Sequence, residues 1–344
     1  MKLSFKIFVW LLICVVGWKN VNAQTAAKRI IVSQDGSGDY KTIQGAINSL
    51  TDSAPTPRTI FIKRGTYKEK VYIEKHNIIL EGENREKTIL TESIARDEWR
   101  CIHNDDWGVA SVNIDGNDIT FKNMTIINSY GFDWTKDETI ICPSDTVTRQ
   151  KRIGRSSHQM ALRTMKATRF KAINCHFKAF GGDTVSPWNV EGGLFYFKDC
   201  VMEGGVDFYC PRGWAYAENC VFITHSGTAA IWHDGSRHQD SKTVLRNCRF
   251  DGFKGFNLGR YHRDAQFYLI NCEFEENMAD RDIFLVPTNN IIQWGRRIYY
   301  FNCHRKGGDY RWHADNFSTA PGNPDPSTAD ARWVFGNKWN PVSN

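Results

Sequence analysis

One short motif recurs through the second half of this 344-residue chain and limits the folds that it can adopt. An Asn or Asp precedes a Cys, and an aromatic or apolar residue usually follows two positions later. The copies are Asn174-Cys175-His176-Phe177, Asp199-Cys200-Val201-Met202, Asn219-Cys220-Val221-Phe222, Asn247-Cys248-Arg249-Phe250, Asn271-Cys272-Glu273-Phe274 and Asn302-Cys303-His304. Successive cysteines lie 25, 20, 28, 24 and 31 residues apart. Such a period is typical of a solenoid of stacked coils.

The segments between the copies favour strands. Phe195-Tyr196-Phe197 and Gln266 to Ile270 are short and rich in aromatic residues, and no long helical pattern is visible between residues 100 and 310. We therefore predict an all-β, single-domain, right-handed parallel β-helix over residues 24–344. Each coil would add one strand to each of about three sheets, and the repeated Asn and Cys would stack at one corner. Phe121 to Ile126 is similar to an earlier copy, with Met124 in the Cys place.

Three segments depart from the repeat. Thr42 to Leu50 carries apolar residues at helical spacing, which predicts a short helix that caps the open N-terminal end of the solenoid. The polar stretch from Asn128 to Ser157 is interpreted as an insertion between coils, where it could shape a binding site. The segment from Gly307 to Asn344 is expected to run as a tail along the solenoid.

Residues 1–23 are typical of a secretory signal peptide, because Lys2 and Lys6 precede the apolar run Ile7 to Trp18 and small residues follow it. The run is shorter than the roughly 20 residues that span a bilayer, although an uncleaved anchor is the alternative. We expect export, to the periplasm first and to the medium second. Removing this segment leaves 41 basic and 38 acidic residues, which argues against nucleic-acid binding. A monomer without a membrane anchor is expected.

Nine of the ten cysteines belong to the mature chain, so at least one has no intramolecular disulfide partner. Cys200 and Cys220 are the favoured bridge, since they would lie one coil apart, and Cys101 with Cys142 is the weaker candidate. The repeat cysteines are interpreted as a buried ladder and not as metal ligands, because no C-x-x-C pairing accompanies them. No metal is expected.

Six stretches, in order along the chain, resemble the pectin methylesterase (pectinesterase) family, carbohydrate esterase family 8. They are Ile31 to Ala46, Gly65-Thr66-Tyr67-Lys68-Glu69, Gln159-Met160-Ala161-Leu162, Gly182-Asp183-Thr184-Val185, Asp207-Phe208-Tyr209-Cys210-Pro211 and Leu258-Gly259-Arg260-Tyr261-His262. The last five are similar to the family's G-x-Y-x-E, Q-A-V-A-L, Q-D-T-L, D-F-I-F-G and L-G-R-P-W motifs. The family fold, shared with pectin lyases, is a parallel β-helix.

The resemblance implies a cofactor-free esterase that hydrolyses methyl esters of galacturonate in pectin or branched pectic oligosaccharides. Asp207 would be the nucleophile, Asp183 the general acid and then base, and Gln159 a donor to the oxyanion. Since 24 residues separate the two carboxylates, they can face each other on adjacent rungs about 4.8 Å apart. A guanidinium from Arg260 would keep Asp207 ionised and leave Asp183 protonated.

Departures from the motifs surround the expected site. Gly182 replaces the family's second oxyanion Gln, a loss that usually lowers the rate by roughly 10²–10³. His262 replaces a Trp, and Cys210-Pro211 ends a motif that normally ends in Phe-Gly. An altered substrate, such as a branched pectin, is therefore expected. The candidate sugar-contacting residues are Tyr209, Tyr261, His262, Trp232 and Trp188, and Trp294 is a further stacking candidate.

Blander interpretations stay open. Asp183 and Asp207 could be turn carboxylates at β-helix corners, Arg260 could form a surface ion pair, and Gln159 could stack in an internal amide ladder. A β-helix lyase or polygalacturonase is a rival, since Trp232-His233-Asp234 is faintly similar to a pectate lyase cluster, but no acidic calcium cluster accompanies it. A non-catalytic protein that binds acidic oligosaccharides is the second rival.

Overall fold

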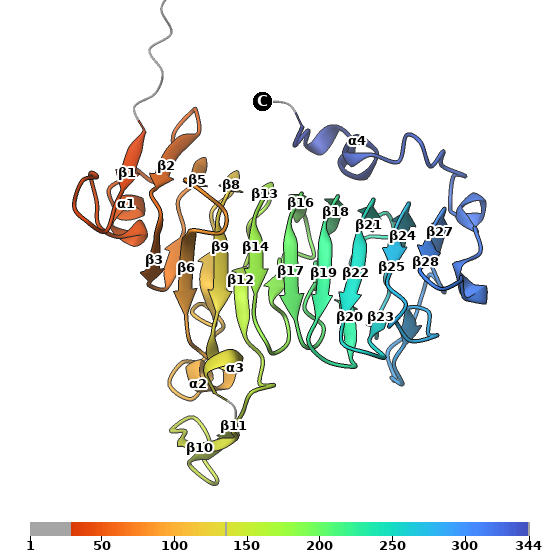
Figure 1. The fold of residues 1–344 in the computed structure, drawn as a ribbon, viewed down its shortest axis with the longest axis horizontal. Coiled ribbons are helices and arrows are strands. Elements are labelled where there is room, and N and C mark those ends of the chain that lie inside the picture. Colours follow the sequence, from red (N-terminus) through yellow and green to blue (C-terminus); the bar gives the residue numbers. More distant parts are fainter. Residues whose placement is uncertain (1–28, 135, 343–344) are drawn as a thin grey trace, which may run out of the picture.

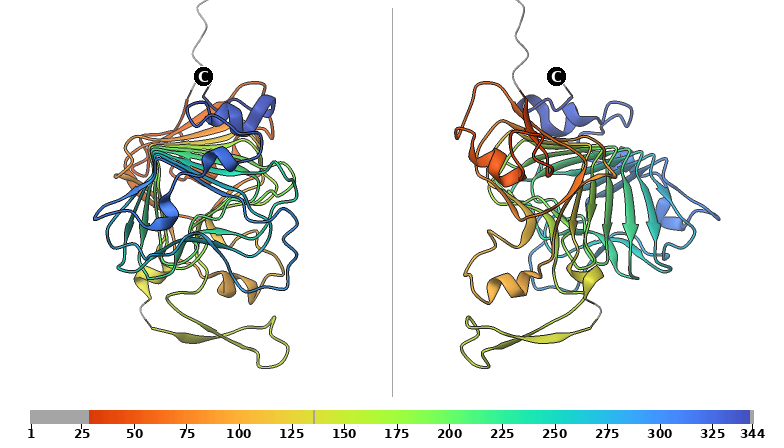
Figure 2. Two further views of the ribbon diagram at one scale, coloured as in Figure 1. Left: turned by 90° about the vertical axis from the view of Figure 1, so that its right-hand side faces the viewer. Right: turned by 60° about the vertical axis from the view of Figure 1, so that its left-hand side comes forward.

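The computed structural model describes residues 29–134 and 136–342 (Figure 1). The predicted signal peptide, residues 1–23, lies outside this part of the chain. The described chain winds into a parallel β-helix, as predicted, in which successive coils stack along one axis (Figures 1 and 2). Across residues 29–134 and 136–342, no helix has the length and apolar character needed to cross a membrane.

Three parallel sheets form the walls of the solenoid. Sheet A consists of β1 (Ile30–Val32), β2 (Arg58–Ile62), β5 (Ile78–Gly82), β8 (Ile119–Lys122), β13 (Phe170–Ile173), β16 (Leu194–Lys198), β18 (Trp214–Glu218), β21 (Thr243–Arg246), β24 (Phe267–Ile270) and β27 (Ile298–Phe301). Sheet B consists of β3 (Gly65–Lys68), β6 (Thr88–Glu92), β9 (Thr125–Asn128), β14 (His176–Lys178), β17 (Val201–Gly204), β19 (Val221–Thr224), β22 (Arg249–Gly252), β25 (Glu273–Phe274) and β28 (His304–Arg305).

Sheet C carries the residues expected to be functional and is interrupted at its middle. One part consists of β4 (Val71–Ile73), β7 (Ala110–Ile114), β12 (Met160–Thr164) and β15 (Val185–Ser186), and the other of β20 (Ala229–His233), β23 (Asn257–Tyr261) and β26 (Phe284–Leu285). Single bridges from Tyr209 to Val185 and to Ile231 join the two parts. The gap between them is where the chain turns sharply at Asp183 and Asp207.

The repeated Asn and Cys form the corner between sheets A and B. The Asn and Asp residues adopt φ values of 49 to 53°, the left-handed region that Asn tolerates, and their side chains hydrogen-bond from coil to coil. Asn247 Nδ2, for example, donates to Asn219 Oδ1 over 3.3 Å. The cysteines point inward and are at most 1% exposed, with Met124 in the same row. The predicted corner is confirmed.

The favoured disulfide is wrong, and the weaker candidate is correct. Cys200 and Cys220 are free, and the thiol of each donates to the carbonyl two residues earlier. Their sulfurs are neighbours on stacked coils and interact as thiols without a covalent bond. The disulfide joins Cys101 to Cys142 and ties the segment after α2 (Arg96–Arg100) to the insertion.

The caps and the insertion lie where the sequence predicts them. Helix α1 (Ile43–Asn48) closes the N-terminal end, and Thr42 Oγ1 caps it by accepting from Gly45 N. The insertion consists of α3 (Tyr130–Asp133) and an antiparallel hairpin of β10 (Glu138–Ile141) and β11 (Gln150–Ile153), which projects from the solenoid (Figures 1 and 2).

The C-terminal tail runs back along sheet A (Figure 1). It contains the short helices η1 (Arg311–His313), η2 (Phe317–Thr319), α4 (Ala331–Phe335) and η3 (Gly336–Lys338). Val334 and Phe335 of α4 belong to an apolar cluster with Tyr196 and Tyr216 on the outer face of sheet A. The tail therefore buries aromatic side chains that would otherwise face solvent, on a side of the solenoid formed by a different sheet from the candidate site.

Candidate active site

Asp183 and Asp207 lie on adjacent coils at the interruption of sheet C. The backbone N–H of Asp183 donates to the carbonyl of Asp207 over 3.1 Å, and a bridge joins Gly182 to Val206. Both aspartates adopt positive φ, 64° and 47°, as the corner asparagines do. The one-coil spacing in the sequence thus brings the two carboxylates together, and the sharp turns direct them away from the regular strand pattern.

Arg260, on β23, holds Asp207 through a bidentate pair. Its Nε and Nη2 donate to the two carboxylate oxygens over 2.9 and 2.6 Å. Burial nevertheless raises the pKa of Asp207 above its usual value, while the hydrogen bonds from Arg260 act in the opposite direction. Arg260 thus lowers the pKa of Asp207, but burial of the carboxylate outweighs the ion pair and the net shift is upward.

A second guanidinium, which the sequence reasoning missed, serves Asp183. Arg212 is 2% exposed, and its Nη2 lies 3.5 Å from Asp183 Oδ2. It also donates Nε and Nη2 to Asp234 over 2.7 and 2.8 Å and Nη1 to the Ser186 hydroxyl and the Cys210 carbonyl. Each carboxylate of the pair thus has its own arginine.

The site opens into a pocket of about 400 Å³. Its lining residues are Arg96, Arg100, Asp106, His158, Arg163, Asp183, Trp188, Arg212, Trp232 and Asp234. The four arginines outnumber the three aspartates, so the lining favours an anionic ligand. Arg163 is 6% exposed, and burial lowers its pKa to about 10. Its guanidinium and that of Arg212 lie 4.6 and 4.5 Å from the Trp188 ring.

Gln159 does not line this pocket. It is fully buried, its Nε2 donates to Arg155 O over 2.6 Å, and its Oε1 accepts from Gly131 N over 2.8 Å. The Gln159 amide therefore joins the insertion to the solenoid. This orientation differs from the expected one, in which the amide would donate to an oxyanion. His158 is the polar neighbour of Gly182, since a Cβ built on Gly182 would lie 3.6 Å from His158 Cδ2.

Two of the expected sugar-contacting residues belong to the core. Tyr209 is fully buried and contacts Phe197 and Phe222 edge-on, and Tyr261 is 5% exposed. Both are removed from the candidate sugar contacts, because their side chains point into the solenoid. Trp232 lines the pocket beside Asp183, His262 and Trp294 line a larger neighbouring cavity, and Trp188 lines both.

The Trp232-His233-Asp234 run has structural partners. His233 is 1% exposed, its Nδ1 accepts from Gly235 N, and burial lowers its pKa to about 4. Asp234 is bound to Arg212, as described above. Over the described part of the chain, no group of three or more His, Cys, Asp or Glu side chains is arranged to hold a metal ion.

Comparisons with known proteins give similar sequences and the same fold. Residues 29–148 match the Pectinesterase family. The pectinesterase/pectinesterase inhibitor U1 of Solanum lycopersicum is 26% identical over 67% of this chain and 35% of that protein. Pectinesterase 31 of Arabidopsis thaliana is 30% identical over 65% of each chain. A pectin methylesterase from Erwinia chrysanthemi has the same fold, with 20% identity and a TM-score of 0.70 over 92% of this chain and 99% of that one. This chain spans about a third of the length of the first plant relatives that it matches.

Proposed function

Because residues 29–148 match the Pectinesterase family, we propose that this chain is a carboxylic ester hydrolase that removes methyl groups from galacturonate residues of pectin or pectic oligosaccharides. The observation that carries the proposal is the pair of carboxylates, Asp183 and Asp207, on adjacent coils, with Asp183 in the wall of a pocket whose arginines outnumber its aspartates. Each carboxylate has a guanidinium that orients it. This arrangement supplies a nucleophile and a proton donor for one ester group.

In the proposed first step, a carboxylate oxygen of Asp207 attacks the ester carbonyl carbon. The bond from that carbon to the methoxy oxygen breaks, and Asp183 transfers its proton to the leaving oxygen, so methanol departs and an acyl anhydride remains on Asp207. In the second step Asp183, now ionised, removes a proton from water as the water oxygen attacks the acyl carbon. The anhydride bond breaks, the uronic acid leaves, and Asp207 is again a carboxylate.

The neighbouring side chains fit distinct tasks in this scheme. Arg260 fixes the two oxygens of Asp207 toward the substrate, and Arg212, itself held by Asp234, positions Asp183. We assign His158 to the developing oxyanion, because it lines the pocket and lies beside Gly182. Gly182 is the position at which the family motif has a glutamine.

The substrate and the compartment follow from the same chemistry. A pocket with more arginines than aspartates suits a polyuronide that also carries free carboxylates, such as a branched pectic oligosaccharide. The Cys101–Cys142 disulfide supports export to an oxidising compartment, and we propose the periplasm.

Methanol release tests the proposal. The wild-type protein should release methanol from methyl-esterified pectin or branched pectic oligosaccharides without added metal, and Asp207→Asn should lower the rate by about 10³-fold or more. Asp240→Asn is the matched control, because Asp240 is an exposed aspartate outside the pocket that pairs with Lys338 over 4.0 Å. Full activity in Asp207→Asn would disprove the assigned nucleophile. Absence of methanol from every methylated uronide would refute the function.

A further inference from the structure

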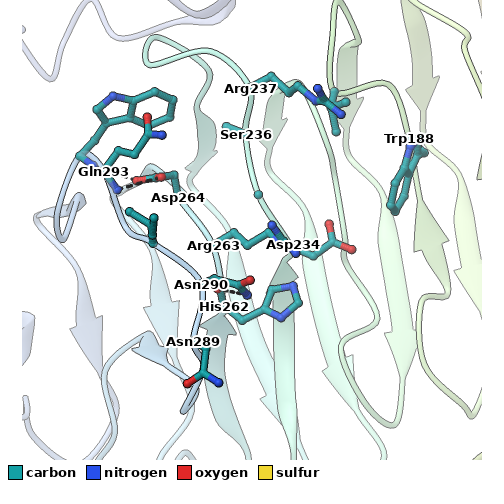
Figure 3. Close-up of a pocket in the computed structure, with 14 residues that line it drawn as sticks. Trp188, Asp234, Ser236, Arg237, His262, Arg263, Asp264, Asn289, Asn290 and Gln293 are labelled. Carbon is teal, nitrogen blue, oxygen red and sulfur yellow. Dashed lines mark hydrogen bonds between the residues drawn. The ribbon is translucent and has the colours of Figure 1, made fainter.

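Asp183, the proposed acid and base, faces a buried network of hydrogen-bond donors. The Ser186 hydroxyl is fully buried and accepts from Nη1 of Arg163 and Nη1 of Arg212 over 2.8 and 2.9 Å. Because these guanidinium groups occupy the acceptor positions of the hydroxyl, its proton is left to donate, and Ser186 Oγ lies 3.5 Å from Asp183 Oδ2. Arg212 is held in turn by Asp234, which Figure 3 shows in the wall of the larger cavity.

The other oxygen of Asp183 faces a thiol. Cys210 Sγ donates to Asp183 Oδ1 over 3.4 Å. The main chain of Cys210 is fixed, because its N–H donates to Val185 O over 2.9 Å and its carbonyl accepts from Arg212 Nη1 over 2.8 Å. The sulfur also contacts the carbonyl of Asp207. The thiol therefore lies between the side chain of the proposed acid and the main chain of the proposed nucleophile.

Cys210 differs from the other free cysteines. The six cysteines of the Asn-Cys corner donate their thiol protons to main-chain carbonyls, and they are Cys175, Cys200, Cys220, Cys248, Cys272 and Cys303. Among the free cysteines of residues 29–134 and 136–342, Cys210 is the one whose thiol reaches a carboxylate. It lies outside the repeat, so the stacking of the corner does not account for its position.

The Cys210 thiol keeps its proton beside Asp183. Cys210 is fully buried, and burial raises the pKa of its thiol well above the usual value, with the negative charge of Asp183 acting in the same direction. A thiol is a weak donor, and it has one proton for two acceptors here, Asp183 Oδ1 and the Asp207 carbonyl. Rotation about the Cβ–Sγ bond moves the proton between them without displacing the sulfur. Such a donor can bind the ionised carboxylate and release the protonated one.

We propose that Cys210 is a positioning residue of the esterase, whose thiol donates to Asp183 Oδ1 when that carboxylate is ionised and holds it in place to activate water in the second step. The inference rests on the proposed function. The thiol forms no covalent bond to the substrate, and its proton stays on the sulfur. In the first step, while Asp183 carries the proton for methanol, the thiol donates to the Asp207 carbonyl. Loss of the thiol therefore slows the second step and spares the first.

Infrared spectroscopy of the S–H stretching band tests the contact without relying on catalysis. Subtracting the spectrum of the corresponding Cys210→Ala variant isolates the Cys210 band. In alkaline buffer, which ionises carboxyl groups, Asp183→Asn should move this band to higher wavenumber, because an amide is a weaker acceptor than a carboxylate. Asp240→Asn, at the exposed aspartate that pairs with Lys338, is the matched control and should leave the band unchanged. An identical band in wild type and Asp183→Asn would overturn the inference.

Methanol-release kinetics identify the step that the thiol serves. Cys210→Ala should lower kcat by about 10-fold and leave kcat/KM unchanged, because kcat/KM reports only the steps up to the departure of methanol. A burst of about one methanol per enzyme molecule should precede the slow phase. Cys210→Ser keeps a donor and should recover part of kcat. Cys248→Ala, which removes an equally buried thiol of the corner, is the matched control and should keep both constants.

A proportional loss of kcat and kcat/KM in Cys210→Ala, as general damage to the site would cause, contradicts the assigned role. Unchanged values of both constants contradict it as well, even if the wild-type protein is an esterase. A shift of the S–H band in a protein that releases no methanol would refute the proposed function, and with it the role of Cys210, while the contact with Asp183 would stand. The two failures are therefore distinguishable.

Discussion

Replacing Arg212 by Met should destabilise the protein by about 3 to 5 kcal/mol, the usual cost of removing one partner from a buried ion pair. The Arg212 side chain is 3% exposed and it serves two carboxylates, of which Asp183 is 9% and Asp234 20% exposed. Without the guanidinium both carboxylates lose their cation, and the Ser186 hydroxyl and the Cys210 carbonyl each lose a donor. Because Asp183 also loses its orienting group, kcat should fall with little change in KM.

Denaturant unfolding followed by tryptophan fluorescence gives the free energy, and Arg332→Met, an exposed change on α4, is its control. The double variant Arg212→Met with Asp234→Asn removes both halves of the pair and should lose less stability than the sum of the two single changes. A loss below about 1 kcal/mol in Arg212→Met, or strict additivity in the double variant, would refute the view that this pair holds the site.

Three further outcomes are expected. Activity should fall as the pH drops through the raised pKa of Asp207, because only the ionised carboxylate attacks. Arg260→Gln should move this acid limb of the kcat/KM profile to higher pH, since it removes a group that lowers the pKa of Asp207. An acid limb at the same pH in both proteins contradicts this. His158→Ala should lower kcat by about 10²-fold if it serves the oxyanion beside Gly182, and unchanged turnover excludes that role. Tyr209→Phe removes a buried hydroxyl that has no hydrogen-bond partner among the described residues, so it should keep full activity and raise the free energy of unfolding by about 1 kcal/mol. A loss of stability would reveal a hydrogen bond to this hydroxyl.

The sequence predicts the solenoid well because each coil repeats one local signal. An Asn that accepts a left-handed turn, followed by a small apolar Cys, specifies a corner from its own residues, and the one-coil spacing then places Asp183 beside Asp207. The partner of Asp183 could not be predicted in this way. Arg212 reaches it from the next coil, and its position depends on the irregular turn that follows Asp207.

The orientation of Tyr209 was mispredicted for a related reason. In a regular strand, successive side chains point to opposite faces of the sheet. The positive φ of Asp207 interrupts this alternation, and Phe208, Tyr209 and Cys210 are all buried. Gln159 differs from expectation because its partners come from the insertion, and no periodic signal specifies how an insertion folds onto a solenoid.

The Asn-Cys corner has a consequence for how such a chain can change. From β8 onward, two residues separate each sheet A strand from the sheet B strand that follows it, and Asn247-Cys248 between β21 and β22 is one example. All variation in coil length therefore falls between a sheet B strand and the next sheet A strand, the part of the coil that includes sheet C and both cavities. Insertions and deletions can remodel the ligand-facing loops while the stacking register is kept at the opposite corner. The molecule thus keeps a regular Asn-Cys corner on one side and loops of differing length on the other, so that ligand-facing loops can change while the fold is kept.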